Sequence, residues 1–282
     1  MKYIFLLTWF LLTFTGHEAF SNHIYAPLRE WTGHVLMEWL CAIGLTLFTF
    51  LLFLIVRDMA NFKLKGEFFR FFIIISAMGL AIPLLMVTNI EIIHYFQYVL
   101  LIIILRSCNL SPLLSYNFSL IISLCDEAKQ YFLYPRFTGY FDWNDLFINN
   151  LGIALGILLM RKAHVHKDKF SYFITSLSIV LMGIIVIWFS SYAIKGNLWF
   201  NLPLLAGQEP TAFPMVNGMK VMVLSLKDAV QPFWQLAARG RTYHIMGVVE
   251  GFCICIATAY GLWYLLQGKK PLANRQILNS ST

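Results

Sequence analysis

The chain has 282 residues, of which 59% are hydrophobic and only 12% are charged, and its net charge at pH 7 is +7. Soluble domains contain about one-quarter charged residues, so the composition indicates a polytopic membrane protein. The basic residues stand in short connections between apolar runs, which is typical of membrane topology signals and excludes nucleic acid as the expected partner. The five cysteines include no CxxC pair, so neither a disulfide framework nor a thiolate metal site is expected.

The apolar runs predict an all-α fold, a polytopic transmembrane helix bundle of seven spans. Residues 1–21 resemble a secretory signal peptide, and an uncleaved eighth span is the alternative. The basic connections all fall on one side if the spans alternate, and that side is predicted to be cytoplasmic. The spans are expected at residues 34–56, 69–88, 90–106, 113–133, 145–160, 171–194 and 244–266.

Residues 195–243 form the longest connection on the opposite, extracytoplasmic side. Their apolar pieces are interrupted by Pro203, Pro210, Pro214 and Pro232, which argues against another crossing. We therefore expect interfacial helices that lie over the mouth of the bundle. Residues 22–282 contain no obvious internal repeat or linker and are predicted to be a single domain.

The polar residues that suggest function concentrate near residues 119–156, where two apolar runs meet. Side chains three or four positions apart share one face of a helix. This spacing brings the polar ends of three predicted helices to one level, and the two glycines allow close helix packing. The candidate polar residues are Glu91, His94, Tyr98, Glu127, Gln130, Arg136, Asp142, Asp145 and Asn149, and the packing glycines are Gly152 and Gly156.

Ionisable side chains are costly inside a membrane and therefore indicate a functional site. The alternative is a structural ion-pair cluster of Glu127, Arg136 and Asp145 that holds a loop against the helix ends. His94 taken alone is also compatible with a hydrogen-bonded core histidine.

The same residues resemble the VanZ-like family of bacterial membrane proteins over about residues 89–160. The family's HxxxY matches His94 and Tyr98, its ExxQ matches Glu127 and Gln130, and its PR pair matches Pro135 and Arg136. Its DxxxNxxGxxxG pattern matches the stretch from Asp145 to Gly156. The resemblance implies a multi-pass protein of the bacterial cytoplasmic (inner) membrane, in a family named for resistance to a glycopeptide antibiotic. The Asp-Lys pair that the family often carries before the His is missing here.

Three hypotheses about function follow. The first is a non-catalytic envelope protein in which Arg136 pairs with the phosphate or carboxylate of an amphiphile, such as a lipid-linked cell-wall precursor, without cofactor or metal. The second is an envelope enzyme with His94 or Glu127 as general acid/base, and one variant holds a divalent metal between His94, Glu127 and Asp145. The third is an accessory or structural subunit whose partners are membrane lipids and other membrane subunits.

Overall fold

The structure, a computed structural model, describes residues 65–86, 89–133, 141–160, 169–199, 213–224, 234–236 and 242–267, together with residues 9, 23, 26–28, 30–31 and 211. The predicted signal peptide and the predicted helix at 34–56 lie outside these ranges, apart from Trp9. The helices are α3 (Lys65–Leu85), α4 (Ile93–Ser107), α5 (Pro112–Leu133), α7 (Trp143–Leu159), α8 (Lys169–Ile194) and α9 (Val248–Gln267), with a short 3-10 helix η2 (Asn89–Ile92) before α4.

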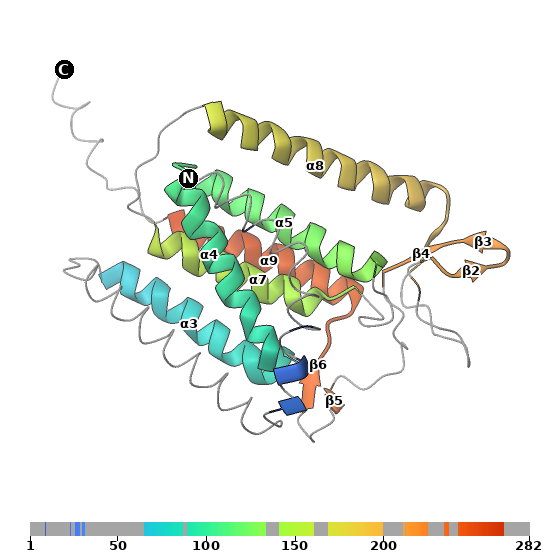
Figure 1. Cartoon of the computed structure of the whole chain (residues 1–282), viewed down its shortest axis with the longest axis horizontal. Coiled ribbons are helices and arrows are strands. Elements are labelled where there is room, and N and C mark those ends of the chain that lie inside the picture. The colour runs from blue at the N-terminus through green and yellow to red at the C-terminus, as the bar shows by residue number, and fades with distance from the viewer. Residues whose placement is uncertain are drawn as a thin grey trace, which may run out of the picture.

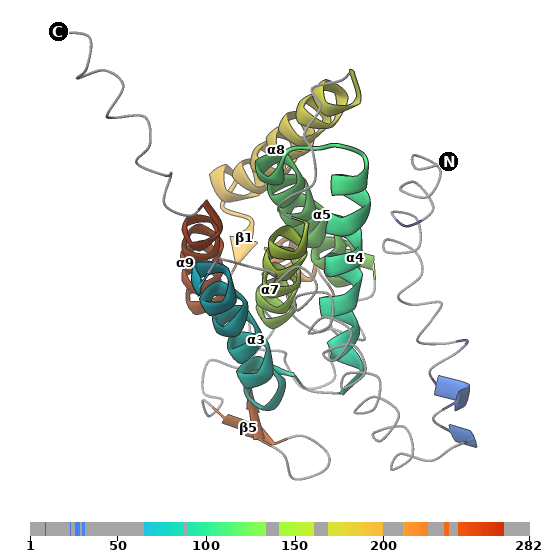
Figure 2. The ribbon, with the colours of Figure 1, turned by 90° about the vertical axis from the view of Figure 1, so that its left-hand side faces the viewer.

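Helix α7 is the central element of the bundle, and α3, α4, α5 and α9 all pack against it (Figures 1 and 2). Every residue from Ile148 to Leu159 is buried. A helix that is covered on all sides is apolar all round, which explains the near-continuous hydrophobic run in this part of the sequence. Helix α8 lies on the outside of the bundle against α5 (Figure 1).

Helices α4 and α5 are joined by a tight link whose residues supply both caps. Asn109 adopts a left-handed conformation with φ of 65°, which ends α4 and lets the Leu110 amide donate to the Leu105 carbonyl. Ser111 then caps α5, because its hydroxyl accepts from the Leu114 amide at 3.2 Å. Pro112 occupies the first helical position, where a missing N–H is harmless. The link therefore turns the chain back within a few residues.

Two glycines of α7 allow α4 to approach closely. A Cβ atom at Gly152 would lie 2.9 Å from the carbonyl oxygen of Tyr95, and one at Gly156 would lie 2.7 Å from Cβ of Ile102. Cβ atoms in real proteins essentially never lie this close to a neighbouring heavy atom. The glycines thus set the spacing between the helix that carries His94 and the helix that carries Asp145 and Asn149.

Residues 198–244 contain short strands in three two-stranded sheets, so the predicted interfacial helices are wrong wherever the structure describes this region. The physical reason is local turn chemistry. Asn217 and Gly218 both have positive φ, at 51° and 76°, and close a two-residue hairpin that a helix cannot accommodate. The antiparallel pairs are β2 (Met215–Val216) with β3 (Met219–Lys220) and β5 (Trp234–Leu236) with β6 (Thr242–His244), and β1 (Leu198–Trp199) runs parallel to β4 (Met222–Val223).

The predicted seven-span transmembrane bundle is also contradicted. Within the ranges that the structure describes, no helix is both long enough and apolar enough to cross a membrane. The runs at 90–106 and 145–160 form α4 and α7, which have 15 and 17 residues and so extend only about 22–26 Å, short of the roughly 30 Å of a bilayer core. Helix α5 carries Asp126, Glu127 and Lys129. The same finding contradicts the predicted multi-pass location in the inner membrane.

The strand segments cover the ends of α5 and α7 at which the polar residues gather. Buried Met222, Leu224 and Met246 pack in one cluster with Tyr131 of α5 and Trp143 of α7. The amide of Phe141, just before α7, donates to the Leu224 carbonyl at 3.3 Å. This cap removes the polar ends of the two helices from solvent.

Candidate metal centre

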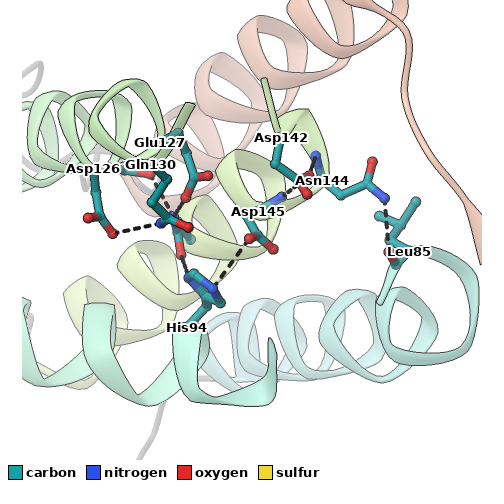
Figure 3. Close-up of polar contacts among 10 residues, drawn as sticks. Leu85, His94, Asp126, Glu127, Gln130, Asp142, Asn144 and Asp145 are labelled. Atoms are coloured by element: carbon teal, nitrogen blue, oxygen red, sulfur yellow. Dashed lines mark hydrogen bonds and ion pairs between the residues drawn. The ribbon is translucent and has the colours of Figure 1, made fainter. Parts of the chain in front are cut away.

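His94, Glu127 and Asp145 meet inside the bundle although they come from three different helices. His94 lies in the first turn of α4, Glu127 near the end of α5, and Asp145 in the first turn of α7, and Figure 3 shows them converging. All three side chains are buried. One ligand atom from each lies within 4.8 Å of the other two. We call this group the triad.

The start of α7 is fixed by Asp142, whose carboxylate accepts from the amides of Asn144 at 3.0 Å and Asp145 at 3.2 Å (Figure 3). An aspartate at this position stabilises a helix because it satisfies amides that have no partner within the helix. The cap places Asp145 in the first turn, where its carboxylate turns into the bundle. Asp142 thus positions Asp145.

Asn149, one turn after Asp145, holds the other two members of the triad. Its Nδ2 donates to the hydroxyl of Ser123 at 2.9 Å and to Oε1 of Glu127 at 3.5 Å, and its Oδ1 lies 3.0 Å from Nδ1 of His94. All four side chains are buried. A single amide therefore orients both the imidazole and the carboxylate.

This arrangement fixes the tautomer of His94. Because the Asn149 NH₂ group faces an oxygen of Glu127 and an oxygen of Ser123, its carbonyl oxygen faces His94, and Nδ1 of the imidazole must be the donor. In the neutral imidazole the other nitrogen, Nε2, then carries a lone pair, and it lies 3.4 Å from Oδ2 of Asp145. An acceptor nitrogen and a carboxylate oxygen at this distance need a proton or a cation between them.

Burial makes negative charge costly at the triad. It raises the pKa of Glu127 and the pKa of Asp145 well above their usual values, and the neighbouring charges of Asp126 and Asp142 raise both further. Glu91, which is half-buried, adds to the effect at Asp145. Without a bound cation both carboxyl groups therefore hold a proton more tightly than exposed carboxyl groups do.

Asp126 and Gln130 form a separate pair on α5. Asp126 is fully buried and lies 3.2 Å from Nζ of Lys129, and Gln130 donates to it at 3.5 Å (Figure 3). Burial raises the pKa of Asp126 to about 6, with Lys129 acting in the opposite direction. Gln130 therefore belongs to this pair rather than to the triad.

The raised pKa of Asp126 predicts a pH dependence of stability. A carboxyl group with a higher pKa in the folded than in the unfolded chain contributes stability that is complete below about pH 4 and is lost as the pH rises towards about 6. We expect the melting temperature in a chelating buffer to fall over this window. The Asp126→Asn variant should show a shallower fall, measured by differential scanning fluorimetry from pH 4 to 7. Identical pH profiles for the two proteins would contradict this assignment.

Asn144, which sequence reasoning missed, ties the strand segment over the site. Its Nδ2 donates to the carbonyls of Leu85 at 2.9 Å and His244 at 2.6 Å, and its Oδ1 accepts from the Met246 amide at 3.0 Å. One side chain thus joins the starts of α7 and α9 with the end of α3. No periodicity in the sequence could have shown this, because the partners are backbone groups 59 to 102 residues away.

The structure brings together His94, Glu127, Asp145 and Asn149 from the predicted site, with Tyr98 one turn deeper. Glu91 and Asp142 lie towards the outside, and Gly152 and Gly156 face α4. Arg136 lies outside the described residues. Ser123 was missed, although the repeat of Ser115, Ser119, Ser123 and Glu127 at every fourth position is a readable polar stripe on α5.

Comparisons of the chain with protein-family models, with curated proteins and with solved structures found no match. The resemblance to the VanZ-like family therefore stays a prediction that depends on the motifs alone.

Proposed function

We propose that the chain binds a divalent transition-metal ion, of the class of Zn²⁺ or Mn²⁺, through His94, Glu127 and Asp145. The observation that carries the proposal is the orientation of His94 by Asn149, which directs the Nε2 lone pair at the carboxylate of Asp145. Histidines that bind metals regularly donate their other ring N–H to an oxygen in this way. The side-chain amide of Asn149 also contacts Glu127, so it orients a second ligand of the triad.

The distances suit a metal better than a direct hydrogen bond. The 3.4 Å between Nε2 of His94 and Oδ2 of Asp145 exceeds the usual length of a charge-assisted hydrogen bond, about 2.7–2.9 Å. Two ligands that lie about 2.0–2.1 Å from a tetrahedral zinc ion are separated by about 3.4 Å. The 4.8 Å spread of the three ligand atoms requires a contraction of about 1.4 Å on metal binding.

The chemistry of the ligands favours the same class of ion. An imidazole suits Zn²⁺ and other late transition metals, whereas carboxylates also accept Mn²⁺. Two carboxylates neutralise a divalent charge, which removes the electrostatic penalty that raises their pKa values. Three protein ligands leave a coordination position open, as in catalytic rather than structural zinc sites.

Metal content after dialysis tests the proposal. The purified chain, freed of metal with a chelator and dialysed against Zn²⁺ or Mn²⁺, should retain about one ion per chain by inductively coupled plasma mass spectrometry. A free metal concentration of about 100 times Kd should stabilise the fold by about 2.7 kcal/mol, which raises Tm by roughly 5–8 °C. We expect His94→Ala to lose both the ion and the rise in Tm.

The matched control is His244→Ala. His244 is also a buried histidine that contacts a carboxylate, Glu250, at 2.8 Å, but it lies outside the triad. This variant should bind metal as the original chain does. Equal retention of metal by the original chain and by His94→Ala, or no retention by the original chain, would refute the proposal.

Metal-free acid/base catalysis is the second candidate, and one observation favours it. Two carboxyl groups whose pKa values are raised lie beside an imidazole, and these are the groups that act as general acids and bases. Under this alternative His94→Ala and the original chain take up the same small amount of metal, so the dialysis experiment separates the two candidates. The amphiphile-binding hypothesis depends on Arg136 and gains no support from the acidic surroundings of the triad.

A further inference from the structure

Hydroxyl groups gather one to two helical turns below the triad, deeper in the bundle. Ser119 and Ser123 lie four residues apart on the face of α5 that also carries Glu127. Tyr98 lies on α4, one turn after His94. These three side chains are 0–1% exposed. They therefore make a polar layer inside a core that is otherwise apolar.

Tyr98 is directed towards the triad. Long side chains on a helix lean towards its N-terminus, and for Tyr98 this is the end of α4 that bears His94. Burial raises the pKa of Tyr98 well above its usual value, the charges of Asp126, Glu127 and Asp145 raise it further, and a hydrogen bond with the Ser123 side chain acts in the opposite direction. The phenol oxygen thus lies within electrostatic reach of the triad and beside Ser123.

Two of these hydroxyls have hydrogen-bonding capacity that no protein group fills. Within the described ranges of the chain, Oγ of Ser119 makes no hydrogen bond, and the phenol oxygen of Tyr98 makes none beyond its contact with Ser123. The neighbouring tyrosine is different, because Tyr95 donates to the Met78 carbonyl at 3.0 Å. Gly152 of α7 faces the Cβ atom of Tyr98. Buried polar groups in folded proteins are almost always paired, with protein or with an ordered water.

We propose that the hydroxyls of Tyr98, Ser119 and Ser123 bind a water molecule on the inner side of the triad, and that this water is the remaining ligand of the metal. The second half of this inference depends on the proposed function, whereas the water site itself does not. Hydroxyls serve as donors or acceptors, so they hold a water in the metal-free chain and donate to its oxygen once a metal binds it. In this arrangement a water molecule occupies the open coordination position of the metal.

The first test compares Tyr98→Phe with Tyr95→Phe in a chelating buffer. Phenylalanine keeps the ring and removes only the hydroxyl, and Tyr95→Phe gives the effect of losing a buried hydroxyl that has a partner. If a water pairs with Tyr98, both variants should lower Tm by a similar amount, about 2–4 °C. An unchanged or higher Tm for Tyr98→Phe alone would overturn the water site, because removing a buried hydroxyl that no water binds relieves the cost of its unfilled hydrogen-bonding capacity.

The second test uses Mn²⁺ as the probe. Electron–nuclear double resonance of the Mn²⁺-loaded chain in ¹⁷O-labelled water should show one strongly coupled ¹⁷O, and this signal should weaken or change its coupling in Tyr98→Phe but not in Tyr95→Phe. No ¹⁷O coupling in the original chain would overturn the water as a metal ligand. Failure of Mn²⁺ to bind at all would refute the proposed function, while the melting temperatures would still decide the water site.

Discussion

Replacing Asn149 with alanine is expected to weaken Zn²⁺ binding by roughly 10- to 100-fold, the usual effect of losing a side chain that orients a metal ligand. Asn149 contacts no metal in our proposal. It fixes the tautomer of His94 through Oδ1 and contacts Glu127 through Nδ2, so its loss frees two of the three ligands. Kd is measured by isothermal titration calorimetry or by competition with a chromophoric chelator.

The next residue along the helix provides the control. Asn150 is as buried as Asn149, but its Oδ1 accepts from the hydroxyl of Tyr116 and does not face the triad. Asn150→Ala should lower Tm, because a buried hydroxyl partner is lost, yet leave the Kd for Zn²⁺ unchanged. An equal loss of affinity in both variants would mean that Asn149 acts only through the stability of α7.

Gly156→Val is expected to destabilise the chain most strongly among the substitutions considered. The new Cβ would lie 2.7 Å from Cβ of Ile102 and 3.1 Å from the carbonyl oxygen of Val99, and the backbone of α4 cannot move aside without separating from α7. Overpacking of this kind costs about 1–3 kcal/mol and occasionally more. We expect Tm to fall by roughly 3–10 °C in a thermal melt.

A glycine elsewhere in the bundle controls for helix propensity. Gly79 of α3 is exposed and has nothing within 4 Å of its would-be Cβ. Gly79→Ala should keep or slightly raise Tm, because alanine favours a helix by about 1 kcal/mol over glycine. Gly156→Ala should lower it. A Gly156→Ala variant that melts at or above the original temperature would show that the contact between α4 and α7 is looser than the structure has it.

The sequence predicted most of the helices and part of the site for a common reason, which is that both depend on local spacing. The helices α3, α4, α5, α7, α8 and α9 each begin and end within four residues of a predicted helix. The placement of His94, Glu127, Asp145 and Asn149 on helix faces, together with short connections, was enough to suggest that their side chains converge.

The sequence could not predict features that depend on distant backbone groups or on helix length. The contacts of Asn144 with Leu85, His244 and Met246 join segments that only the fold brings together. The apolar runs were read as membrane spans, but hydrophobicity does not reveal whether a helix ends after 15 residues, as α4 does. The role of Asn149 as a link between two ligands was equally invisible, because its spacing indicated only a polar helix face.

X-ray absorption spectroscopy of the Zn²⁺-loaded chain tests the metal site most directly. The account predicts a first shell of nitrogen and oxygen atoms at about 2.0–2.2 Å, with outer-shell scattering from one imidazole and no sulfur at about 2.3 Å. The imidazole scattering should disappear in His94→Ala and persist in His244→Ala. A sulfur shell, or imidazole scattering that is unchanged in His94→Ala, would place the ion elsewhere and contradict a metal site formed by His94, Glu127 and Asp145.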